Sequence, residues 1–219
     1  MDLSIASSFD AFPPASRAPS ILQSRRLQRL HDRMARPVRA GRRQGRAMAT
    51  DRLFLAVVPP PDVAARIGEL ARRLKIGHDL TGRPLESPQF HVTLCHLGDG
   101  IGLPRERVAL ATERAAAVAM PAFKVAFDRV MSFRNGAFVL CGDDSVIGLE
   151  VLQQRLSDAL DGSPRPARPF TPHVTLLRDS LIVPEHPIEP IGWEVRDMVL
   201  VHSLLGRTTH RLLARLPLG

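Results

Sequence analysis

Several residue types that mark particular classes of protein are scarce in this chain. Its 219 residues include no tyrosine, one tryptophan and two cysteines, Cys95 and Cys141. Two cysteines cannot build a disulfide framework and lack metal-ligand spacing, so we interpret them as small buried side chains of an intracellular protein. No apolar run approaches the roughly 18 residues that span a bilayer, and no signal-peptide core is present. We therefore expect a cytoplasmic protein with no membrane partner.

Two common catalytic motifs are missing as well. There is no Gly-x-x-x-x-Gly-Lys run to hold a triphosphate, and no Gly-x-Ser-x-Gly turn to expose a nucleophilic serine. These absences argue against nucleoside triphosphate hydrolysis and against a serine hydrolase.

Acidic residues are few at the N-terminal end. Residues 1–49 contain ten arginines and three aspartates and so carry +7 of the formal charge of +8. The rest of the chain is left with about +1. A pI near 11.1 is typical of nucleic-acid-binding proteins, but here any contact of the folded part with RNA must be local.

We expect residues 1–47 to be a disordered, Arg-rich extension and residues 50–219 to form one domain of two intertwined lobes. The extension has little periodic apolar content, so it cannot bury enough surface to fold. Its composition is also typical of an organelle transit peptide. The simpler interpretation, an extension upstream of a natural start at Met48, is favoured because a strand begins just after that residue.

From Asp51 onward, strands and helices alternate in the predicted pattern. Apolar runs and turn signals predict strands over residues 53–58, 90–97, 123–133, 137–141, 170–177, 195–203 and 210–216, and helices over residues 62–74, 104–120 and 145–160. The order of elements is similar in the two halves. This similarity favours an α+β protein with two lobes and an internal duplication.

The sequence His-Val-Thr-Leu occurs twice, at residues 91–94 and 173–176. Side chains alternate along a strand, so the histidine and the threonine of each copy lie on one face. Two such strands facing each other would place His91, Thr93, His173 and Thr175 around one small cavity. Two imidazoles can serve as acid and base near neutral pH, and hydroxyls donate to phosphate oxygens. A metal site is disfavoured because two histidines fall short of the three or four ligands that zinc requires.

With these motifs and their surroundings, the chain resembles the 2H phosphoesterases, and among them the LigT-like RNA 2′,3′-cyclic phosphodiesterases of the 2′-5′ RNA ligase family. The resemblance covers roughly residues 50–219. It includes the opening strand at 52–56, the two motifs with their flanks at 90–98 and 172–178, and the C-terminal Leu200-x-x-Ser203-x-x-Gly206 segment. It implies a bilobal α+β fold with two pseudo-symmetric lobes, an antiparallel sheet and flanking helices in each, and a catalytic cleft between them.

The resemblance also implies an activity without cofactor or metal: hydrolysis of a terminal RNA 2′,3′-cyclic phosphate to a 2′-phosphate, with reversible 2′-5′ ligation as an accompanying activity. His91 would donate a proton to the leaving oxygen, and His173 would accept one from water. Thr93 and Thr175 would bind the phosphate oxygens. Arg178 either adds charge at the strand end or forms an ordinary surface salt bridge.

Two positions depart from the family pattern. His96 stands where the family commonly has Phe, and His210 lies in the region where a Tyr is usual. Base-stacking or phosphate contacts of those aromatic residues therefore do not carry over directly.

Two other interpretations stay open. The substrate could be a small cyclic nucleotide or a 2′-5′-linked oligonucleotide, or the protein could bind RNA ends without turnover. In each case the expected partner is an RNA end or a small nucleotide, and the expected oligomeric state is a monomer. The Arg-rich segment would add sequence-independent affinity for RNA.

Overall fold

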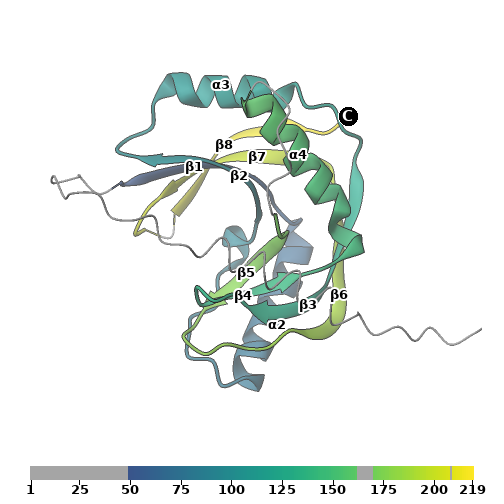
Figure 1. Ribbon diagram of the computed structural model, residues 1–219. Helices are drawn as coiled ribbons and strands as arrows, with labels where there is room; N and C mark the ends of the chain where they lie inside the picture. Colours follow the sequence, from purple (N-terminus) through teal and green to yellow (C-terminus); the bar gives the residue numbers. More distant parts are fainter. Residues whose placement is uncertain (1–48, 162–169, 208) are drawn as a thin grey trace, which may run out of the picture. The chain divides into compact units, whose positions relative to one another are not determined.

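The computed structural model describes residues 49–161, 170–207 and 209–219. Within these ranges the strands form two antiparallel four-stranded sheets (Figure 1). The first sheet has the strand order β2-β1-β7-β8, and the second has the order β5-β4-β3-β6. The fold is therefore α+β with two pseudo-symmetric sheets, as the sequence predicted. The extension expected over residues 1–47 lies outside the described residues.

The first sheet combines the beginning and the end of the described chain. Its strands are β1 (Asp51–Val57), β2 (Val92–Gly100), β7 (Asp197–Leu204) and β8 (Thr209–Pro217). The β7–β8 pair is the closing hairpin expected from the sequence. Gly206 lies in its connection with φ +78°, a left-handed conformation that glycine adopts without steric cost.

The second sheet contains one strand that the sequence analysis missed. Its strands are β3 (Phe123–Ser132), β4 (Ala137–Cys141), β5 (His173–Arg178) and β6 (His186–Val195). No strand was predicted between 177 and 195, and Val195 was assigned to the start of the next strand. That assignment is wrong: β6 ends at Val195 and β7 begins at Asp197. Pro187 and Pro190 argue against a strand in the interior of a sheet, so the sequence did not predict β6. Strand β6 is an edge strand, where proline is tolerated.

The two sheets repeat one arrangement around the duplicated motif. The motif strands β2 and β5 each lie at an edge, and each pairs in antiparallel orientation with the second strand of its sheet, β1 or β4. The third positions are taken by β7 and β3. The strand order is therefore similar in the two sheets and places the two motifs at equivalent positions.

Two of the helices each follow a strand of one sheet and pack against the other sheet. Helix α2 (Pro61–Gly77) follows β1 of the first sheet but packs against β5 and β6 of the second. Helix α4 (Ile147–Asp161) follows β4 and packs against β2 of the first sheet as well as β3, with α3 (Arg105–Ala116) beside it. In Figure 1, α3 lies beside β8 and α4, and α2 lies beside the second sheet. Two short 3₁₀ helices complete the helical elements, η1 (Ser87–Gln89) and η2 (Asp144–Val146).

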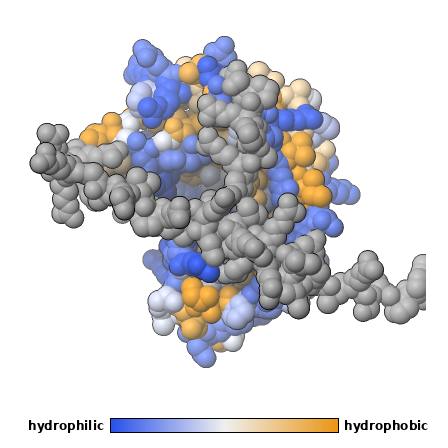
Figure 2. All heavy atoms as spheres, in the orientation of Figure 1, coloured by the Kyte–Doolittle hydropathy of each residue, from blue (hydrophilic) through white to orange (hydrophobic). Residues whose placement is uncertain are grey.

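One face of each sheet contributes to a single large core, and the opposite faces carry two small apolar clusters. Apolar stripes of the helices, such as Ile67 and Leu156, fill the large core. The small clusters are Phe54, Ala56, Val199 and Val201 on the first sheet, and Phe133, Ala137 and Val139 on the second. The surface in Figure 2 is mainly hydrophilic, with separate apolar patches. Among the described helices, none is long and apolar enough to cross a membrane.

Candidate active site

The strand register places both motif threonines on the sheet faces that carry the small apolar clusters. Thr93 lies opposite Ala56, and Thr175 lies opposite Val139. Paired residues of antiparallel strands project to the same face. Both threonines are partly buried, and in the described part of the chain neither hydroxyl bonds to another protein atom. The hydroxyls are therefore available to a ligand.

His91 lies immediately before β2 and is oriented by the turn that precedes it. Its Nδ1 is 2.7 Å from the carbonyl oxygen of Gln89, the last residue of η1. A carbonyl only accepts, so Nδ1–H is the donor and Nε2 is left for a ligand. The ring also packs on Phe54 with a centroid distance of 5.0 Å.

His173, the first residue of β5, is held in the same way. Its Nδ1 is 2.7 Å from the carbonyl oxygen of Thr171, again two residues earlier in the chain. Its ring meets Phe133 edge to face at a centroid distance of 4.9 Å. Both motif histidines therefore have one ring nitrogen bound to the backbone and one phenylalanine beside the ring.

The two histidines are close enough to influence each other electrostatically. The pKa of His91 is lowered from 6.5 to about 4, mainly by burial and to a smaller extent by positive charge on His210 or His173. The hydrogen bond to Gln89 acts in the opposite direction. His91 is therefore neutral at neutral pH in the empty site. Contacts between β2 and β5 agree with this proximity.

Arg178 lies on the same sheet face as Thr175, at the exposed end of β5 opposite Ala137. Among the described residues no carboxylate forms an ion pair with it, so the surface salt bridge considered from the sequence is not present there. Its guanidinium can therefore meet an anion at the end of the strand.

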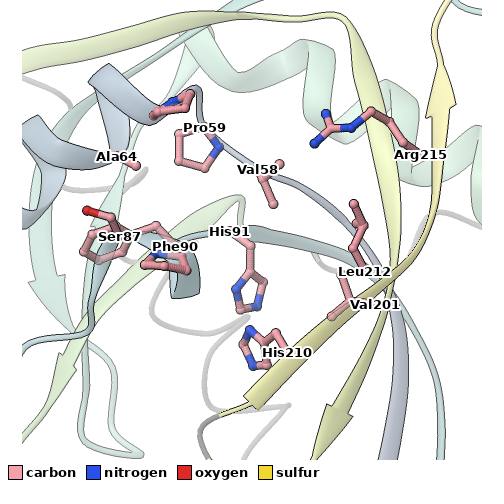
Figure 3. A pocket seen from close by; sticks show the side chains of 12 residues that line it. Val58, Pro59, Ala64, Ser87, Phe90, His91, Val201, His210, Leu212 and Arg215 are labelled. Atoms are coloured by element: carbon pink, nitrogen blue, oxygen red, sulfur yellow. The ribbon is translucent and has the colours of Figure 1, made fainter.

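His210 was not assigned a role from the sequence, yet it lies against His91. The two ring centroids are 5.2 Å apart, and His210 also meets Phe54 at 5.8 Å. Both histidines line a cavity of about 360 Å³ beneath the start of α2, whose other walls are mainly apolar (Figure 3). The only sequence signal for His210 was its departure from the family's usual tyrosine.

Cys141, which lies near the second motif, has no acid–base role in the described structure. Cys141 lies opposite His173, and burial raises the pKa of its thiol to about 12, so it is protonated at neutral pH. The described residues include no group of three His, Cys, Asp or Glu side chains that could hold a metal ion. The available chemistry is that of two imidazoles, two hydroxyls and a guanidinium.

The comparisons with known proteins agree with this geometry. The family described as the 2′-5′ RNA ligase superfamily matches residues 59–204. The chain belongs to this superfamily and is a LigT-like 2H phosphoesterase by fold and motif. No curated protein matches the chain.

Solved structures give the same result. Escherichia coli LigT in its apo form is 26% identical with a TM-score of 0.64, and the match covers 78% of this chain and 99% of LigT. LigT complexed with 3′-AMP is 26% identical with a TM-score of 0.62, covering 77% and 98%. A protein of Thermus thermophilus, 23% identical with a TM-score of 0.56 and covering 76% and 97%, shares the fold.

Proposed function

We propose that this protein hydrolyses the 2′,3′-cyclic phosphate at the end of an RNA to a 2′-phosphate, using His91 and His173 as an acid–base pair. The observation that carries the proposal is the matched tautomer of the two motif histidines. Each donates Nδ1–H to a backbone carbonyl at 2.7 Å, so proton transfer would use Nε2 of each ring. A reaction that needs one proton removed and one donated uses such a pair.

The proposed steps balance as follows. Water attacks phosphorus, and its proton passes to Nε2 of His173. The bond between phosphorus and O3′ breaks, and Nε2–H of His91 protonates O3′. The product carries a 2′-phosphate and a free 3′-hydroxyl. Each proton transfer typically contributes 10²–10⁴-fold to the rate.

His91 has to gain a proton before it can act as the acid. Burial keeps it neutral in the empty site. An anionic phosphate at hydrogen-bond distance favours the imidazolium and raises the pKa. Protonation of His91 therefore accompanies substrate binding in this proposal.

Thr93 and Thr175 would donate hydrogen bonds to the non-bridging phosphate oxygens, where charge develops in the transition state. Removing one such donor typically costs 10²–10³-fold in rate. Arg178 would add positive charge beside Thr175. This donor set holds a phosphate without a metal ion, so we expect activity in the presence of EDTA. In the 2′-5′ ligation implied by the family, a 5′-hydroxyl would take the place of water as the nucleophile, with the same proton acceptor and donor and the same P–O3′ bond broken.

A small cyclic nucleotide is the second candidate substrate. The cavity of about 360 Å³ beside His91 lies within the range of small-ligand sites. A LigT structure has been solved as a complex with 3′-AMP, which supports a nucleotide as the occupant of this cavity. The same two histidines would perform the same chemistry on it.

The test is an assay in EDTA on a short RNA ending in a 2′,3′-cyclic phosphate, with separation of the 2′- and 3′-phosphate products. We expect the 2′-phosphate alone. His186→Ala is a control variant that should form the product as the wild type does, because His186 contacts His78 instead of the motif strands. Formation of the 3′-phosphate, or turnover only after metal addition, would contradict the proposal. Binding without turnover would indicate an RNA-end binding protein.

A further inference from the structure

Strand β2 contains an irregularity that brings a third side chain to the face of His91 and Thr93. Ala56 pairs with Thr93, but the next residue of β1, Leu55, pairs with Cys95, so Leu94 is an extra residue in β2. After this bulge the pairing continues with Phe54 opposite His96. An extra residue reverses the alternation of side chains. His96 therefore projects to the same face as Thr93.

Strand β5 repeats this irregularity at the same place in its motif. Thr175 pairs with Val139 and Leu177 with Phe138, so Leu176 is the extra residue. Arg178 then lies opposite Ala137, on the face of Thr175. His96 and Arg178 thus occupy equivalent positions in the two sheets, each five residues after a motif histidine. Both side chains can donate hydrogen bonds to an anion.

The side chain of His96 is part of a small charged cluster. Its Nε2 lies 2.8 Å from Oδ1 of Asp99, and because a carboxylate accepts, Nε2–H is the donor. Arg52 binds the same carboxylate through two hydrogen bonds of 2.8 and 2.7 Å. The charge of Asp99 is thereby balanced by Arg52. The His96 side chain is 51% exposed, so an incoming anion can reach Nδ1.

Resting on the proposed function, we propose that His96 binds the phosphate that joins the last two nucleotides of the RNA. The residues opposite Thr93 and His96, Ala56 and Phe54, are two positions apart on β1, a distance of about 6.6 Å. This is of the order of the spacing between neighbouring phosphates of a single strand. Protonated His96 donates Nδ1–H to that phosphate, and its Nε2 remains bound to Asp99.

The first sheet is favoured over the second as the path of the RNA because the backbone at the end of β5 is covered by the segment around Gly82, although the Arg178 side chain itself is exposed. A Cβ on Gly82 would lie 2.0 Å from the carbonyl oxygen of Arg178, so the chain around Gly82 lies directly against this strand end. The carboxylate of Asp179 lies next to Arg178 in the chain and binds the backbone of Thr81 and Gly82. At the corresponding end of β2, the side chains of His96 and Arg52 are exposed.

Three substrates test this inference: a nucleoside 2′,3′-cyclic phosphate, a dinucleotide ending in the same group, and that dinucleotide with a neutral methylphosphonate linkage. The quantity measured is kcat/KM of the natural dinucleotide relative to each of the other two. We expect His96→Ala to lower both ratios about 3- to 10-fold through KM, as for a partly exposed charge-assisted hydrogen bond. His186→Ala should leave both ratios as in the wild type.

The outcomes separate this inference from the proposed function. If the wild type hydrolyses none of the three substrates, the proposed function fails. If the wild type hydrolyses all three and His96→Ala changes neither ratio, the proposed function stands and the role of His96 is overturned. If His96→Ala lowered kcat/KM equally for the natural and the neutral dinucleotide, the role of His96 would also be overturned, because the contact would not depend on the phosphate charge. Thermal unfolding of the variant confirms that it is folded.

Discussion

At the scale of single residues, the two motif histidines are oriented in the same way. Each ring uses Nδ1 to bind the carbonyl oxygen two residues earlier in the chain. The tautomer is therefore set by local backbone geometry. The pairing of His91 with His173 was predictable from the repeated motif, since one residue pattern occurred twice in similar apolar surroundings. The backbone partners and the rings of Phe54 and Phe133 were not, because sequence spacing does not give side-chain contacts.

The first prediction concerns the protonation of His91. Its pKa is lowered to about 4, mainly by burial, so the empty protein should hold it neutral at pH 6. Bound inorganic phosphate or a nucleoside 2′-phosphate should raise this pKa, because the anion stabilises the imidazolium. NMR titration of the His91 ring proton measures both values. His173→Asn provides a control that simplifies assignment and retains the buried surroundings of His91.

The sign of the expected shift makes this prediction specific. A depressed pKa means that the unfolded chain binds the proton more tightly than the folded protein, so burial of His91 reduces stability as the pH falls from 6.5 towards 4. A ring that titrates near 6.5 in the empty protein, or one that phosphate leaves unchanged, would contradict the account of His91 as an acid charged by its substrate.

At the scale of secondary-structure elements, periodicity predicted most strands and helices but not their irregularities. The apolar repeats of α2 and α4 and the turn signal at Asn135-Gly136 gave the correct element types. Strand β6 was missed because its prolines are unfavourable within a sheet interior, and only the strand order reveals that β6 is an edge. The bulges at Leu94 and Leu176 were missed because the prediction assumed that side chains alternate between the two faces along the whole strand.

The second prediction concerns the close approach of Gly82 to the end of β5. A Cβ at this position would lie 2.0 Å from the carbonyl oxygen of Arg178, well inside van der Waals contact. Gly82→Ala should therefore lower the free energy of unfolding by about 1–3 kcal/mol, because the backbone has to move. Urea denaturation measures the change.

Gly77→Ala is the matched control for this variant. Gly77 is the last residue of α2, and a Cβ there meets nothing within 4 Å. Alanine is the better helix former, so this variant should be as stable as the wild type or slightly more stable. Equal stability of Gly82→Ala and Gly77→Ala would show that the contact with Arg178 does not constrain the strand end.

At the scale of the whole described molecule, the exchange of helices joins the two sheets through one core. Helix α2 follows a strand of the first sheet and packs on the second, whereas α4 follows a strand of the second sheet and packs on β2 of the first as well as on β3. The resemblance predicted intertwined lobes, but which helix covers which sheet required the structure, because an apolar stripe does not specify its partner. Strands β2 and β5 are in contact, so the two motif histidines come close together although they lie 82 residues apart in the sequence.

The charge distribution also has a whole-molecule consequence. Most of the formal charge belongs to residues 1–49, and the rest of the chain is nearly neutral. In the proposed function, contacts of the folded part with RNA would therefore come from individual side chains such as Arg178 and His96. Such contacts recognise an RNA end at short range and provide little long-range attraction.

The most direct measurement of the central claim is kcat/KM for the wild type, His91→Ala, His173→Ala and the double variant on one short RNA with a 2′,3′-cyclic phosphate end. If the two histidines act as a single acid–base pair, each single substitution should lower kcat/KM at least about 100-fold. The kcat/KM of the double variant should be only a few-fold lower than that of the less active single variant, because the effects of residues that act as a unit do not add. Losses that multiply in the double variant, or a single variant with the wild-type rate, would contradict the account.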